Sequence, residues 1–227
     1  AFKNGGGMVF TNASTITMKD MSITENSGWT GGAFVINNQN VKFTAENCDF
    51  SRNKAVEAHA GAFYVVWGVT DALLKNCTIT DNYAKQDGGA IYQANGNLLT
   101  LTDCTLTGNS AGRQGGAIWS KSPTHLVNCE ISNNSAGAEG GGICTGPMGA
   151  SNLRRPIIMQ LENCVMENNA SGAQGGGIYI TSGSWFEAEG LELKGNTSKL
   201  EGSAVWTSDN VLLTNATVTN NASQNGG

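Results

Sequence analysis

Apolar and polar residues alternate in short runs along the chain, and glycines or asparagines interrupt these runs. Alternation of this kind predicts β-strands with one buried face, because successive side chains of a strand point to opposite sides. No stretch keeps the three- and four-residue apolar spacing of an amphipathic helix. The pattern therefore predicts an all-β protein made of many short strands.

The most regular feature of the pattern is a short segment that occurs eight times and ends on asparagine. Five copies carry a cysteine, as in NCDFSRN and NCTITDN, and three weaker copies do not. Successive copies lie 27, 29, 27, 25, 35, 27 and 25 residues apart, a period that is typical of a solenoid. The terminal residues are Asn26, Asn53, Asn82, Asn109, Asn134, Asn169, Asn196 and Asn221.

Two further motifs complete each unit of the repeat. A glycine motif such as GGAI follows seven of the eight asparagines, and another apolar patch precedes the next cysteine segment. Each unit thus predicts three short strands and three turns. We predict one segment over residues 1–227, a three-faced parallel β-helix of about eight coils of 25–29 residues with one longer coil. We expect it to be right-handed by the general rule for parallel crossovers.

Stacked coils place corresponding residues in columns about 4.8 Å apart. The cysteine and the apolar residue two positions later share a face, so we expect both to point inward. The weak copies have Met, Leu or Ala in place of cysteine, which favours a column of buried free thiols. One or two disulfides, or a bound metal, are the alternatives. The column contains Cys48, Cys77, Cys104, Cys129 and Cys164, and Cys144 lies on another face.

The terminal asparagines form a second predicted column. Asparagine tolerates tight turns, and stacked amides form hydrogen-bonded ladders. We therefore expect a structural ladder along the axis.

A third column is predicted to point outward, directly after the inward apolar residue of the glycine motif. Val35 and Cys144 belong to it, but most of its members are aromatic. An exposed aromatic row suggests an interaction surface, which would stack on sugar rings, pack against another filament or lie beneath a loop. A row without any role is the remaining alternative. The aromatic members are Tyr64, Tyr92, Trp119, Tyr179 and Trp206.

The 35-residue unit contains the stretch TGPMGASNLRRP, which predicts a loop that leaves the coil between Thr145 and Pro156. Loops on rigid scaffolds often carry recognition. Adjacent Arg154 and Arg155 are therefore our candidates for a contact with a neighbouring filament or an acidic partner.

Composition narrows the range of functions. The net charge is −5 and no basic patch is present, so nucleic acid is not an expected partner. No run of 18 apolar residues predicts a membrane span. Seven aspartates are spread over different coils, and for His59 and His125 a surface role is expected. We therefore expect a non-catalytic protein without a cofactor.

The paired motifs resemble the repeats of chlamydial polymorphic outer membrane proteins and related bacterial surface proteins. The sequence GGAI occurs at residues 88–91 and 115–118, and FSRN at residues 50–53. The resemblance extends over essentially every coil. It implies a β-helical passenger with an adhesive role, displayed outside the cell or on its surface.

The two ends of the chain also fit the repeat. If the final GG is joined to the initial AF, the sequence reads GGAF, which is the motif at residues 31–34. We expect a window of a longer solenoid, continued by tandem repeats or by copies stacked end to end. The expected function is a structural or adhesive module of an extracellular fibre or surface protein, with host or matrix glycans or proteins as further partners. The alternative is a β-helix that binds or cleaves polysaccharide.

Overall fold

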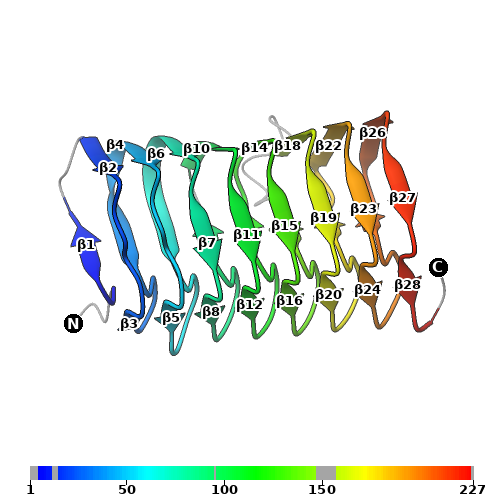
Figure 1. Cartoon of the computed structure of the whole chain (residues 1–227), viewed down its shortest axis with the longest axis horizontal. Coiled ribbons are helices and arrows are strands. Elements are labelled where there is room, and N and C mark those ends of the chain that lie inside the picture. The colour runs from blue at the N-terminus through cyan, green and yellow to red at the C-terminus, as the bar shows by residue number, and fades with distance from the viewer. Residues whose placement is uncertain (1–4, 12–14, 95, 147–156, 226–227) are drawn as a thin grey trace.

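The computed structural model describes residues 5–11, 15–94, 96–146 and 157–225. Within them the chain forms a rod of stacked coils, with the first and last strands at opposite ends (Figure 1). In this part of the chain no helix is long and apolar enough to cross a membrane. The predicted all-β parallel β-helix is confirmed.

Three parallel sheets run along the rod. The long sheet contains β1 (Met8–Phe10), β2 (Thr15–Lys19), β4 (Phe34–Glu46), β6 (Phe63–Lys75), β9 (Ile91–Gln93), β10 (Gly96–Thr102), β13 (Ile118–Ser120), β14 (Thr124–Val127), β17 (Ile143–Thr145), β18 (Ile157–Glu162), β21 (Ile178–Ile180), β22 (Ser184–Glu189), β25 (Val205–Thr207) and β26 (Asn210–Thr214). The six-stranded sheet contains β7 (Thr78–Thr80), β11 (Thr105–Thr107), β15 (Glu130–Ser132), β19 (Val165–Glu167), β23 (Glu192–Lys194) and β27 (Thr217–Thr219). The eight-stranded sheet contains β3 (Ser27–Gly28), β5 (Lys54–Ala55), β8 (Tyr83–Ala84), β12 (Ser110–Ala111), β16 (Ser135–Ala136), β20 (Ala170–Ser171), β24 (Thr197–Ser198) and β28 (Ala222–Ser223).

The coils differ from the sequence prediction in the number of strands. Three were predicted per unit, but a central coil has four, such as β9, β10, β11 and β12. Both β9 and β10 pair with the 13-residue strand β6, which continues where the later coils are interrupted. Pro123 marks one interruption, between β13 and β14, because proline has no N–H to donate to a sheet. The strands on either side of each interruption still belong to the same sheet, which is one of the three.

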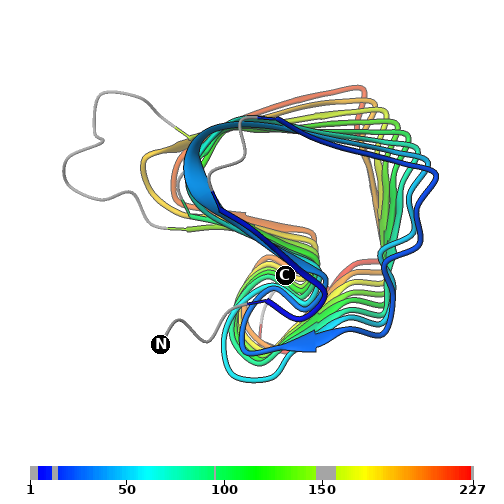
Figure 2. The ribbon, with the colours of Figure 1, turned by 90° about the vertical axis from the view of Figure 1, so that its left-hand side faces the viewer.

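Apolar side chains of equal position stack inside the rod. On the six-stranded sheet Ile79 pairs with Leu106, which pairs with Ile131, and all three are 0% exposed. Viewed along the rod, successive coils follow the same outline, each displaced slightly from the one before it (Figure 2). A single coil buries little apolar surface alone, and burial therefore depends on the neighbours.

The paired glycines of most units form a tight corner. Gly88 has φ of +67°, a conformation that favours glycine. A Cβ atom on the following Gly89 would lie 1.9 Å from the carbonyl oxygen of Gly116 in the next coil. The second glycine is therefore required by the close approach of two backbones.

Candidate functional site

The predicted asparagines form a ladder inside the rod. The backbone N–H and the Nδ2 of Asn82 donate to Oδ1 of Asn109, at 3.1 and 3.0 Å. Nδ2 of Asn82 also donates to the carbonyl of Phe50 in the preceding coil, at 2.8 Å. The same pattern links the remaining members, and every Oδ1 acceptor belongs to the following coil. The asparagines therefore connect the coils rather than face a ligand.

The five predicted cysteines line the interior beside this ladder, each 2% exposed or less. The thiol of Cys104 donates to the carbonyls of Leu74 and Thr102, at 3.6 and 3.3 Å. All six cysteines are free. Hydrogen bonding to Cys104 together with burial raises the pKa of the Cys77 and Cys129 thiols. In this structure the cysteines form a column of buried free thiols.

The predicted aromatic column stacks on itself. The rings of Tyr92 and Trp119 lie 4.3 Å apart and are inclined by 3°, and those of Tyr64 and Tyr92 lie 5.2 Å apart. Beyond Cys144 the stack resumes with Tyr179 and Trp206, at 4.6 Å. Because neighbouring rings cover one another's faces, the surfaces that would stack on a sugar ring are largely occupied.

The column is less exposed than the sequence suggested. Its residues do lie outside the central apolar cluster, but Val35, Trp119 and Cys144 are 1%, 4% and 0% exposed. The tyrosines are half-buried, and burial raises the pKa of Tyr64 and Tyr92. Alternation along a strand places a side chain on one side or the other, but it does not show what covers that side.

A column of polar residues borders the aromatic column, and the sequence reasoning missed it. Each member directly precedes the corner residue with positive φ, which is Gly88 in one coil and Ala60 in another. Backbone bonds stack the members from coil to coil, since each corner N–H donates to the next member's carbonyl. The sequence did carry a signal, because the position before the corner is polar in every coil. The column contains Thr30, His59, Asp87, Gln114, Glu139, Gln174 and Glu201.

Asp87 is the centre of a network within this column. It is 4% exposed, its Oδ2 lies 3.2 Å from Nδ1 of His59, and its Oδ1 accepts the backbone N–H of Gln114 at 3.1 Å. Nε of Arg113 lies 3.8 Å from Oδ1. The imidazole of His59 stacks on Tyr92 at 4.2 Å, so His59 is a half-buried member of the network and not a surface residue.

The side chain of Gln114 extends the network to the next coil. Its Nε2 donates to Glu139 at 2.8 Å, and its Oε1 accepts the indole N–H of Trp119 at 3.1 Å. The polar and aromatic columns are therefore joined.

Within the described residues no three His, Cys, Asp or Glu side chains are arranged to hold a metal.

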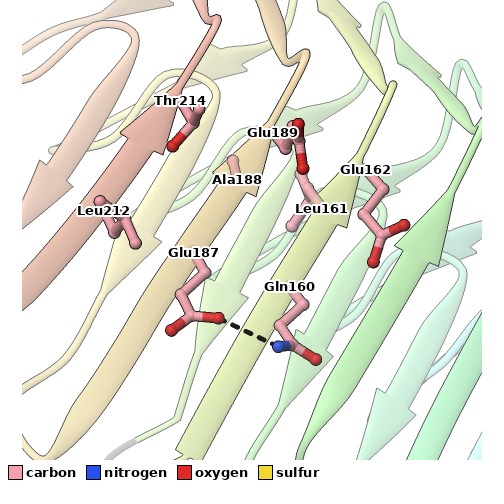
Figure 3. A pocket seen from close by; sticks show the side chains of 8 residues that line it. All are labelled: Gln160, Leu161, Glu162, Glu187, Ala188, Glu189, Leu212 and Thr214. Atoms are coloured by element: carbon pink, nitrogen blue, oxygen red, sulfur yellow. Dashed lines mark hydrogen bonds between the residues drawn. The ribbon is translucent and has the colours of Figure 1, made fainter.

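A shallow hollow of about 150 Å³ lies elsewhere, on the outer face of the long sheet. Gln160 on β18 donates to Glu187 on β22 at 3.0 Å, and both point outward from their strands (Figure 3). His125 on β14 lies 2.8 Å from Glu162. The lining residues are Gln160, Leu161, Glu162, Glu187, Ala188, Glu189, Leu212 and Thr214. Arg154 and Arg155, the other predicted contact residues, lie outside the described residues.

Parallel strands, interior ladders and corners that repeat in register define a parallel β-solenoid. The chain belongs to the right-handed β-helix family, since the family's sequence profile, described as a right handed beta helix region, matches residues 32–223. The match includes seven of the eight ladder asparagines. No curated protein and no solved structure matches the chain.

Proposed function

We propose that the chain is a non-catalytic structural or adhesive module of an extracellular fibre or surface protein. One observation carries the proposal: the chemically versatile side chains serve contacts between coils. The asparagine amides bond to neighbouring coils, and the rings of Tyr92 and Trp119 stack on each other. Residues used in this way make a rod rigid and leave its outer faces for contact.

The resemblance to chlamydial polymorphic outer membrane proteins supports the adhesive part of this proposal. A surface location and partners such as copies of the chain, or glycans and proteins of a host or matrix, belong to the same proposal. A rigid rod suits this role, because it holds a contact surface at a fixed distance from its attachment point.

The proposal is tested by measuring binding and cleavage on the same preparation. We expect the purified chain to be retained by immobilised matrix glycans or proteins without releasing new reducing ends or unsaturated sugars from soluble polysaccharides. Release of such products, in proportion to the amount of chain, would contradict the proposal.

A polysaccharide-binding or polysaccharide-cleaving protein is the second candidate, and the network around Asp87 favours it. A histidine whose Nδ1 lies 3.2 Å from a buried carboxylate, with Arg113 nearby, is an arrangement able to move a proton. Glycan binding or cleavage that is lost in His59→Gln and kept in His125→Gln would support this candidate. The second variant is the matched control, because His125 also pairs with a carboxylate but lies on the outer face.

A further inference from the structure

We propose that the outer face of β18, β22 and β26 is a docking surface for residues 147–156 of a second copy of this chain. The proposal rests on the structural role proposed above and names its lateral partner. The docking surface is defined by the hollow lined by Glu162, Glu187, Glu189 and Leu212, together with Trp185, which lies two residues before Glu187 on the same face of β22.

The net negative charge of the chain lies in its last third, which includes the docking surface. Residues 157–227 contain two lysines and seven acidic residues, which is −5 and equals the net charge of the whole chain. Residues 1–156 contain eleven cations and eleven acidic residues, so their net charge is zero. One end of the rod is therefore acidic, and its field attracts a basic partner.

Two carboxylates of the docking surface are available for a cationic partner. Glu187 accepts a neutral amide from Gln160, and neither Glu187 nor Glu189 lies within ion-pair distance of a described lysine or arginine. Glu162 is already paired with His125. The pair Glu187 and Glu189 comes from one strand, with both side chains on the same face.

Apolar side chains lie next to these carboxylates. Trp185 is 38% exposed and Leu212 is 52% exposed. A purely ionic partner would leave this apolar surface in water. The docking surface therefore fits a segment that combines positive charge with apolar side chains.

Residues 147–156, PMGASNLRRP, have this composition. Arg154 and Arg155 are the only adjacent cations in the sequence, and Met148 and Leu153 accompany them. A guanidinium binds a carboxylate through two parallel hydrogen bonds and also stacks on indole faces. Charge and apolar character are thus complementary to the docking surface.

Chain direction favours a second copy over the same molecule. The segment joins β18 at Ile157, whereas the hollow involves Gln160–Glu162 at the other end of that strand. Five residues of extended strand span about 17 Å. Arginines that precede Ile157 would have to turn back along the strand to reach the hollow of their own coil, whereas the arginines of a second copy are not tied to the start of this β18.

The test uses two charge-reversed variants of the chain, Glu187→Arg with Glu189→Arg, and Arg154→Glu with Arg155→Glu. Sedimentation should show concentration-dependent association of the wild type that weakens at least about tenfold from about 50 to about 500 mM NaCl. Each variant alone should remain monomeric, because its segment and its docking surface repel each other. An equimolar mixture of the two variants should associate again, because each supplies what the other lost.

The control is Asp71→Arg with Asp81→Arg, which changes the net charge equally on other coils and should still associate. Circular dichroism checks that every variant folds. A monomeric wild type, association that persists in either variant, or a mixture that stays monomeric would overturn the proposal. If docking fails in this way while the rod still binds matrix components without cleaving them, the proposed structural function stands.

Discussion

The inside of the rod and the outer face of the long sheet are formed by the same coils, but residue type repeats from coil to coil only on the inside. Inside, Asn53, Asn109 and Asn169 make the same bonds in coil after coil. On the outer face one row of paired positions changes from Thr44 to Leu73, then to threonine, histidine, glutamine, glutamate and leucine. Positions that depend on their neighbours repeat, and positions that face outward carry what is specific to this protein.

The largest effect should come from breaking the ladder at Asn134. Asn134→Ala removes the acceptor of two donors on Asn109 and the donor to the carbonyl of Leu106. Because these groups stay buried without partners, we expect a loss of about 3 kcal/mol in unfolding free energy, measured by chemical denaturation.

The neighbouring residue provides the control for this loss. Asn133 is exposed and has φ of 56°, which glycine adopts freely. Asn133→Gly should change stability by less than about 0.5 kcal/mol. Equal losses in the two variants would remove the distinction between inside and outside.

A smaller effect is expected for a thiol inside the rod. Cys104→Ser places a hydroxyl among apolar neighbours, and we expect a cost of about 1–2 kcal/mol in unfolding free energy. In the unchanged protein a disulfide reagent at pH 8 should modify no thiol until denaturant is added, since all six cysteines are buried. Rapid modification of the folded chain would show that the column is open to solvent.

The aromatic column should respond to alkaline pH. Burial raises the pKa of Tyr92 above its ordinary value of 10.0, so its contribution to stability is complete below pH 10 and is lost as pH rises through the higher folded-state value. Tyr92→Phe keeps the stacking and removes the ionisation. We expect its melting temperature to fall less than that of the wild type between pH 8 and about pH 11. An identical fall in both would show that Tyr92 ionises as freely as in water.

The smallest effect is expected on the outer face. Leu73 is 39% exposed and lies in the row that contains Thr44. Leu73→Thr should change the unfolding free energy by less than about 0.5 kcal/mol in chemical denaturation. A loss comparable to that of Asn134→Ala would mean that this face is also part of the core.

The sequence predicts the repeated features of this fold well because repetition makes them visible. Asn109 and Cys104 recur at the same place in other units, and recurrence in a solenoid implies contact between coils. The burial of Trp119 was not predictable, since alternation gives only the side of the strand. The network of Asp87 was missed because its members share polarity and not identity, so His59 and Gln114 do not look alike in an alignment of units.

In the described part of the rod, the bonds between coils join each coil to the coil before it and the coil after it. Asn109 and Asn134 are 25 residues apart and hydrogen-bonded, and Asn134 in turn donates to Asn169. Removing residues 110–134 would therefore bring Asn109 directly under Asn169 and leave a shorter rod with the same cross-section. The length of the rod can therefore be shortened or extended by one coil at a time without changes to the remaining coils.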